Sequence, residues 1–269
     1  MSNNAFDDNA FEALDEELFA TASGANASSP TAASVSASPA NVAPEADRNG
    51  RFLAELASIS KFCGRNPTTR ETPRMHALVH LTRFAHTRSH LDDLASVVAG
   101  WREARHSIDA HMSREIVGRC INLGHPEVAL FILANRPKYG IDLPSLHVAR
   151  VLLQSLCKRA REDAPPVAVD AESSPPVTSS RVNDVFLLAA LYPHYKLPEV
   201  YDDPVSLAMV LGFCTSSTDD AARQIGADLM DAARSRRTIS TPVKIELSDR
   251  EKEWVREGRS SIPYPVVWA

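Results

Sequence analysis

The chain has 269 residues, with 29 Lys and Arg against 34 Asp and Glu, and a formal net charge of −5. That length can bury a sizeable core in one large domain or in two small ones. The sequence has only ten glycines and no glycine-rich phosphate-binding loop, its four cysteines lie far apart, and no apolar run is long enough for a transmembrane helix. These features argue against a P-loop nucleotide-binding protein, a disulfide-stabilised protein and a membrane-spanning protein.

Residues 1–50 are predicted to form a disordered acidic tail. Residues 1–47 contain eight acidic and no basic side chains, and residues 20–46 are mostly Ala, Ser, Thr and Pro, which bury too little apolar surface to offset the cost of ordering. Phe11, Leu14 and Leu18 nevertheless follow a helical spacing. This segment either keeps the chain soluble or folds as an amphipathic helix on a protein partner.

Residues 51–161 are predicted to form a helical region, because their apolar residues recur at helical spacing. A first helix is expected near 51–62. Thr72 and Ser89 are expected to cap the second and third helices, with Pro73 at the first position of the second. Three further helices are expected to begin at Asp109, Pro126 and Pro144, and Gly124 is placed to end the helix that begins at Asp109.

The remaining chain divides into three parts. Residues 162–180 are rich in Pro and Ser and are predicted to be a flexible linker. Residues 181–237 form a second helical region, in which Asp203-Pro204 and Thr218 are expected to begin helices. Residues 238–269 form a C-terminal extension, where 241–247 alternates like a strand and Ser248 with Glu251 makes a capping box for a short helix.

The spacing of the expected helices predicts the architecture. The first helices of successive pairs begin at Pro73, Asp109 and Pro144, which are 36 and 35 residues apart, and the second helices begin at Ser89 and Pro126, 37 residues apart. A period in the mid-thirties built from helix pairs is typical of a helical-repeat solenoid. The sequence therefore predicts an all-α fold with a short solenoid, and an irregular helical bundle is the alternative.

The stretch from about 111 to 145 resembles a pentatricopeptide repeat. Gly124, the pair Ala129-Leu130 and the pair Gly140-Ile141 match the spacing of that family, and Pro144 lies one residue late. The resemblance implies paired helices and RNA binding. The positions that read a base in the family fall on Arg114 and on Pro144 or Ser145, which are not the usual small polar and Asn or Asp pair. We therefore expect contact with phosphates rather than base recognition.

A second resemblance covers segments 75–84 and 135–144, which are similar to fungal proteins of the mitochondrial small ribosomal subunit. It implies a mitochondrial location and ribosomal RNA or protein partners. The acidic N-terminus, with no Arg before Arg48, differs from an Arg-rich mitochondrial presequence. The cytoplasm is therefore the alternative location.

The distribution of charge permits an RNA partner despite the net charge of −5. Residues 48–119 carry twelve basic and seven acidic side chains, and eleven of the twelve are Arg, which matches phosphate geometry better than Lys. Such a segment either binds an RNA backbone or is an ordinary solvated surface. The residues predicted to contact phosphates are Arg74, Arg83, Arg88, Arg102, Arg105, Arg114 and Arg119.

No catalytic or cofactor motif is found in the sequence. The pairs His76/His80 and His86/His90 have the four-residue spacing that places two imidazoles on one helix face, but no third metal ligand lies nearby in sequence. We expect these histidines to be structural, with no bound metal or cofactor. The sequence thus predicts a non-enzymatic scaffold for RNA or a ribonucleoprotein, and the alternative is a cytosolic protein–protein interaction module of tetratricopeptide type.

Overall fold

The computed structural model describes residues 45–69, 73–162, 178–217, 219–236, 243–256 and 258–268. Most of the predicted tail, including Phe11, Leu14 and Leu18, lies outside these residues, as do Thr72, Thr218 and 163–177 of the predicted linker. The described residues are mostly helical, which confirms the predicted helical class. None of the described helices combines the length and the apolar character needed to cross a membrane.

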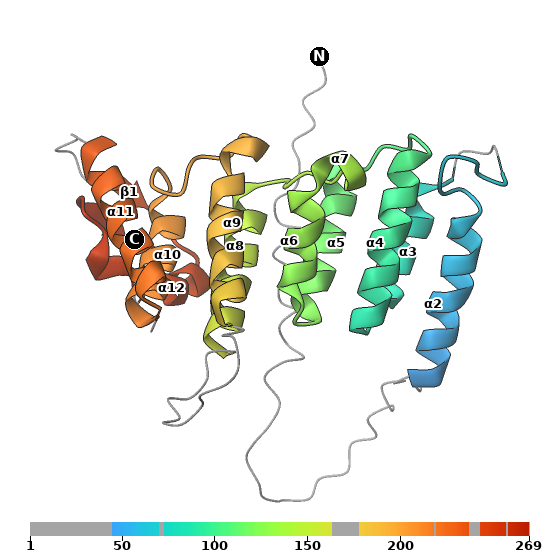
Figure 1. Cartoon of the computed structure of the whole chain (residues 1–269), viewed down its shortest axis with the longest axis horizontal. Helices are drawn as coiled ribbons and strands as arrows, with labels where there is room; N and C mark the ends of the chain where they lie inside the picture. Colours follow the sequence, from blue (N-terminus) through green and yellow to red (C-terminus); the bar gives the residue numbers. More distant parts are fainter. Residues whose placement is uncertain are drawn as a thin grey trace, which may run out of the picture. The chain divides into compact units, whose positions relative to one another are not determined.

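The elements follow one another as short helices with a small C-terminal sheet (Figure 1). They are α2 (Glu45–Ser60), α3 (Met75–Phe84), α4 (Arg88–Glu103), α5 (Ala110–Asn122), α6 (Pro126–Ala134), α7 (Arg136–Tyr139), α8 (Leu146–Glu162), α9 (Thr178–Leu191), η1 (Pro193–Tyr195), α10 (Pro204–Ser216), α11 (Asp220–Arg236), β1 (Val243–Ile245), α12 (Asp249–Trp254), η2 (Arg259–Ser261) and β2 (Val266–Trp268). Strands β1 and β2 pair in parallel, with Lys244 opposite Val267.

The helices pack in two rows. In the first row α3 packs on α5, α5 on α8 and α8 on α10, while in the second row α4 packs on α6 and α7, and α6 packs on α9. The rows are joined by the pairs α5/α6 and α8/α9, and α10 also packs on α11. Figure 1 shows α4, α6 and α9 in front of α3, α5 and α8. Helices α3, α4, α5, α6 and α8 therefore each contact a later helix of their own row, and the hairpins α5/α6 and α8/α9 also pair across the rows.

Helix α10 is the most completely buried element. Every residue from Pro204 to Cys214 is buried, because α10 packs on α8, α11, α12 and η2. The C-terminal extension crosses it very closely: a Cβ atom added to Gly258 would lie 1.8 Å from the carbonyl oxygen of Ala208. Only glycine fits there, so the extension is an integral part of the fold.

Several helix ends match the sequence prediction. The Asp203 side chain caps α10 by accepting the N–H of Ser206, with Pro204 at the first helical position, and Pro126 begins α6. The capping box of Ser248 and Glu251 is present at α12. These signals are local, because a cap depends on side chains only three residues apart.

Other predicted helix ends are wrong. Thr87, not Ser89, caps α4, because its backbone is extended and its hydroxyl accepts the N–H of His90 at 3.2 Å. Helix α3 begins at Met75, since Arg74 is extended and leaves Pro73 outside the helix. Helix α2 begins at Glu45, before the expected residue 51. Of the predicted strand 241–247, residues 241 and 242 lie outside the described residues, and β1 ends at Ile245 rather than at Leu247.

A buried ion cluster joins α8, α10 and α12. The Arg150 guanidinium donates to both carboxylate oxygens of Asp203, at 2.5 and 3.0 Å, and to Glu251 at 2.8 Å. Asp203 also accepts the Ser206 hydroxyl at 2.6 Å, and Glu251 accepts the Ser248 hydroxyl at 2.9 Å. Burial lowers the pKa of Arg150, but the two carboxylates outweigh burial and raise that pKa above its ordinary value.

Helix α2 is attached to α4 through His90. The buried ring of His90 stacks on Phe52 with centroids 3.9 Å apart, and its Nε2 lies 2.9 Å from the Asn49 Oδ1. Burial first, and then neighbouring His86, lower the pKa of His90, while Asp93 raises it. The lowered pKa favours the neutral ring, whose Nε2–H donates to the Asn49 Oδ1 and whose Nδ1 accepts the backbone N–H of His86.

The ion cluster predicts a large cost for removing its cation. Arg150→Met should lower the free energy of unfolding by about 3–5 kcal/mol, because Asp203 and Glu251 stay buried without a counter-charge. Urea unfolding measures this loss. Arg223→Met, at an exposed arginine of α11, is the matched control and should change stability by less than about 0.5 kcal/mol. Adding Asp203→Asn and Glu251→Gln to Arg150→Met removes the two buried negative charges and should restore part of the lost free energy of unfolding. If the triple variant is no more stable than Arg150→Met, unpaired buried charge is not the cause of the loss.

The attachment of α2 should weaken in acid. As pH falls below about 6.5, His90 of the unfolded chain takes up a proton that the same residue binds less readily in the folded state. The contribution of His90 to the free energy of unfolding therefore falls with pH. Hydrogen-exchange protection factors of α2 amides should drop between about pH 7.5 and 5.5 more than those of α10. His90→Phe keeps a ring against Phe52 but cannot titrate, so its protection should lose this pH dependence. An equal drop in the variant would rule out His90 as the cause.

Candidate nucleic-acid interface

Two of the seven predicted phosphate-binding arginines bridge neighbouring helices. Arg83 of α3 pairs with Glu115 of α5 at 3.3 Å. Arg88 of α4 pairs with Glu127 of α6 at 2.5 Å, and Glu127 lies 3.8 Å from Arg181 of α9. These arginines hold partners within the fold, so their assignment as RNA contacts remains a prediction that requires those partners to be shared or exchanged.

Arg119 is also engaged within the fold. Its Nε donates to the carbonyl oxygen of Ala85 at 2.6 Å, which satisfies a backbone acceptor just after the end of α3. Burial, followed by repulsion from Arg48, lowers the pKa of Arg119. Arg114 is half-buried on α5. The other five of the seven are exposed, and of these Arg74 before α3 and Arg102 and Arg105 at the end of α4 have no carboxylate partner among the ion pairs described above.

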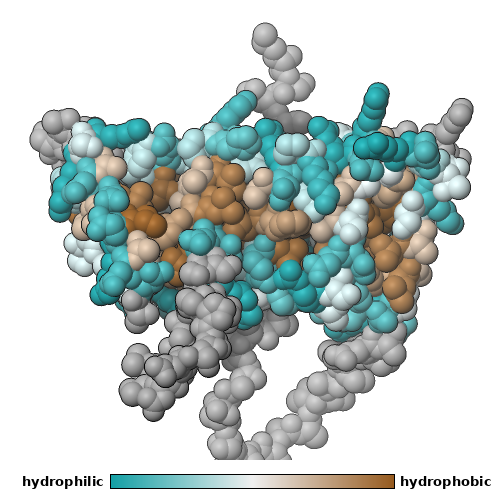
Figure 2. All heavy atoms as spheres, viewed as in Figure 1, coloured by the Kyte–Doolittle hydropathy of each residue, from teal (hydrophilic) through white to brown (hydrophobic). Residues whose placement is uncertain are grey.

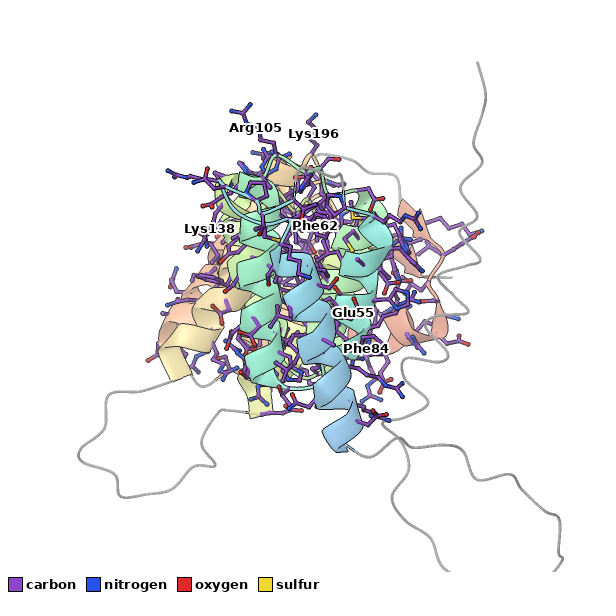
Figure 3. All side chains as sticks on the ribbon, turned by 90° about the vertical axis from the view of Figure 1, so that its right-hand side faces the viewer. Glu55, Phe62, Phe84, Arg105, Lys138 and Lys196 are labelled. Atoms are coloured by element: carbon purple, nitrogen blue, oxygen red, sulfur yellow. The ribbon has the colours of Figure 1, made fainter. Side chains whose placement is uncertain are left out.

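Exposed cations gather where second-row helices end. We call Arg102, Arg105, Lys138 and Lys196 the basic edge. They lie at the C-terminal ends of α4, α7 and η1, and all four are exposed. Figure 3 shows Arg105 and Lys196 at the upper tip of the helical body, pointing away from it, with Lys138 toward the same end. Lys138 and Lys196 were not predicted, because they lie outside the basic segment 48–119.

Two of these cations occupy a backbone conformation that normally selects glycine. Arg105 has a φ of 65° and Lys196 a φ of 60°, and they are the only non-glycine residues with positive φ in the described part of the chain. Each ends its helix as the left-handed residue of a Schellman motif: the N–H groups of Arg105 and His106 bond to the carbonyls of Arg102 and Trp101. The left-handed conformation costs an L-residue about 1–2 kcal/mol. Arg105 and Lys196 therefore carry a conformational cost in the folded state that glycine would not.

The structure also joins the ends of α4 and α7. Gly140, the left-handed cap of α7, lies under Arg102, because a Cβ atom added there would be 2.7 Å from the Arg102 Cδ. Lys138 lies 5.0 Å from the ring centroid of Tyr139. The Arg102 and Lys138 side chains are thus held against neighbouring groups, which lowers the entropy that these two side chains lose on binding.

Acidic side chains at the same edge are largely engaged. Asp109 caps α5 by accepting the N–H of Met112 at 2.7 Å, and Asp142 forms a two-bond ion pair with Arg136. Glu103 is the exposed carboxylate between Arg102 and Arg105 in sequence. The edge therefore keeps a net positive character that suits a polyanion.

The residues of the pentatricopeptide-like stretch lie in and after the α5/α6 hairpin. Ala129, Leu130 and Ile141 are buried, and Gly124 and Gly140 have φ of 73° and 66°. Gly124 ends α5 as predicted. Pro144 is half-buried just before α8, which begins at Leu146.

The nucleophilic and metal-ligating side chains show no catalytic arrangement in the described segments. Burial raises the pKa of Cys120 to about 12 and of Cys214 to about 11, so neither thiol ionises near neutral pH. No three His, Cys, Asp or Glu side chains of the described residues are grouped to hold a metal ion. The His76 and His80 rings do meet each other, with their Nε2 atoms 3.0 Å apart.

Comparison with known proteins gives no relative: no protein-family model, curated protein or solved structure matches this chain.

The left-handed cations give a test of the basic edge. Arg105→Gly with Lys196→Gly should leave the free energy of unfolding unchanged or raise it by up to about 1 kcal/mol, because relief of the left-handed cost is offset by greater freedom of the unfolded chain. Thermal and urea unfolding measure this. Arg105→Ala with Lys196→Ala removes the same charges but keeps the strain, so it is the control. A marked loss of stability in the glycine variant would show that both side chains serve the fold.

Proposed function

We propose that this protein is a non-enzymatic helical-repeat scaffold that binds RNA, or RNA within a ribonucleoprotein, through the phosphate backbone along its basic edge. The supporting observation is that exposed cations project from the ends of successive second-row helices, two of them from left-handed positions. Phosphate contacts of this kind supply affinity without sequence information.

The helix positions support a repeat. Helices α3, α5 and α8 begin at residues 75, 110 and 146, at intervals of 35 and 36 residues. Their fourth, seventh and eighth residues are buried in every case, as expected when equivalent faces stack on one another. These residues are Leu78, Leu81 and Thr82 in α3, Ser113, Ile116 and Val117 in α5, and Ala149, Leu152 and Leu153 in α8.

Contacts between hairpins support the same proposal. The bonds Arg83–Glu115, Arg88–Glu127 and Arg119–Ala85 join residues 32, 39 and 34 positions apart, which is close to one repeat length. All three bonds tie the α3/α4 hairpin to the α5/α6 hairpin. A row of hairpins presents its loops along one edge, where an extended polyanion can contact several of them.

The segments similar to mitochondrial small-subunit proteins, 75–84 and 135–144, favour ribosomal RNA or its proteins as the partner and the mitochondrion as the location. In the base-reading positions of pentatricopeptide repeats this chain carries half-buried Arg114 and Pro144. We therefore propose binding that depends on charge and salt rather than on base sequence.

A protein partner is the second candidate. Large apolar side chains are exposed on helices of several hairpins, with Phe131 of α6 at 54% and Leu187 of α9 at 43% exposure. Figure 2 shows hydrophobic surface over the region where α6 and α9 pack together. This surface favours a protein-interaction module of tetratricopeptide type in the cytoplasm, or a scaffold that contacts protein and RNA at once.

Neutralising the basic edge should weaken RNA binding and its salt dependence. Arg102, Arg105, Lys138 and Lys196 changed together to Gln should lower the affinity for a mixed-sequence single-stranded RNA of about 20 nucleotides. Four phosphate contacts contribute about 0.7 each to the slope of log K against log salt concentration, so the slope should shrink by about 3. Fluorescence anisotropy over a salt series measures both quantities.

The matched control removes four positive charges elsewhere. Lys158, Arg223, Arg234 and Lys252 are exposed on α8, α11 and α12, and their change to Gln should leave the slope almost unchanged. An equal loss in both variants would mean that only total charge matters. No salt-dependent binding by the unaltered protein would overturn the RNA proposal and favour the protein partner.

A further inference from the structure

The two histidines of α3 form a closely paired site on the surface. His76 is exposed and His80 half-buried, one helical turn apart. Their Nε2 atoms form a hydrogen bond at 3.0 Å, in which one ring donates to the other, and their rings meet edge to face, with centroids 4.3 Å apart and planes at 80°. The two nitrogen atoms that bind metals in proteins therefore lie next to each other on one face of a helix.

This separation equals the one that a metal ion requires. First-row divalent ions bind imidazole nitrogen at about 2.0–2.1 Å, which places two ligand nitrogens about 2.9 Å apart at a right angle and about 3.3 Å apart at the tetrahedral angle. The observed 3.0 Å lies between these values. The terminal torsion of histidine is broad, so once an ion displaces the proton shared by the two Nε2 atoms, both lone pairs can turn toward that ion.

We propose that His76 and His80 form a bidentate site for a divalent transition-metal ion that prefers nitrogen ligands, such as Cu²⁺, Ni²⁺ or Zn²⁺. Two protein ligands leave the other positions to water. Affinity follows the order Cu²⁺ above Ni²⁺ and Zn²⁺, and the oxygen-seeking ions Mg²⁺ and Ca²⁺ do not compete. The site is independent of the RNA proposal.

The surrounding charges are compatible with a cation. Arg83, one turn beyond His80, is the nearest cation on the outer part of the same helix, and its guanidinium is paired with Glu115. The pairing reduces its repulsion of a bound ion. The remaining ring near His80 is Phe84, at 6.1 Å between centroids, which is uncharged.

The second histidine pair has the same spacing but is already engaged. The Nδ1 of His90 accepts the backbone N–H of His86 at 3.4 Å, its Nε2 is bonded to Asn49, and its ring is stacked on Phe52. Both ring nitrogens of His90 thus have partners within the fold. His86/His90 is therefore an internal comparison, in which identical spacing should give no metal site.

Calorimetric titration of the full chain without a histidine tag tests the proposal, with Ni²⁺ as the probe at about pH 7.5, where an ordinary imidazole is neutral. We expect one ion per chain. His76→Ala and His80→Ala should each weaken binding by at least about tenfold, because loss of even an outer-shell partner costs that much at metal sites. Cu²⁺ should bind more tightly than Ni²⁺, and Mg²⁺ should release no heat.

His86→Ala is the matched control and should bind Ni²⁺ like the unaltered protein. Alanine favours the helix at positions 76 and 80 of α3, whereas His86 lies between α3 and α4, and circular dichroism verifies that each variant is folded. Unchanged Ni²⁺ affinity in His76→Ala and His80→Ala would overturn the proposal, as would an equal loss in His86→Ala. RNA binding by the same variants should stay unchanged, so failure of this site and failure of the basic edge are distinguishable.

Discussion

The fold depends on the packing of each helical hairpin on the next one. A short amphipathic hairpin such as α5/α6 cannot bury its apolar surface alone, and it does so by packing on α3 and α4 on one side and on α8 and α9 on the other. Arginines reinforce these contacts between hairpins. Exposed ion pairs add little free energy, about 0–1 kcal/mol each, so apolar burial provides the stability and the arginines fix the register.

This topology also creates the basic edge. Because second-row helices end at the same side, their C-terminal ends and the residues that cap them share one edge. The C-terminal end of a helix carries partial negative charge, which favours a cation. That effect alone accounts for Arg102 in the last turn of α4. It does not account for Arg105 and Lys196, since glycine at a left-handed cap would avoid the steric cost, as Gly124 and Gly140 do.

Features that depend on neighbouring residues could be predicted from the sequence. The caps at Asp203 and Ser248, the helix start at Pro126 and the end at Gly124 all rest on signals a few residues long. The engagement of Arg83, Arg88 and Arg119 could not be predicted, because their partners lie 32 to 39 residues away. Lys138 and Lys196 could not be predicted either. The packing of the helices, not the charge of the neighbouring sequence, places them at the same edge as Arg105.

The two His pairs show why spacing alone does not decide chemistry. His76/His80 and His86/His90 have the same four-residue separation, yet only the first has its Nε2 atoms turned toward each other. The difference has two causes: His86 lies between α3 and α4 rather than on a helix, and α2 reaches His90 through Asn49 and Phe52, about forty residues earlier in the chain. The packing of α2 therefore makes one pair part of the core, while α3, which carries the other pair on its open face, leaves both imidazoles within reach of a ligand from solvent.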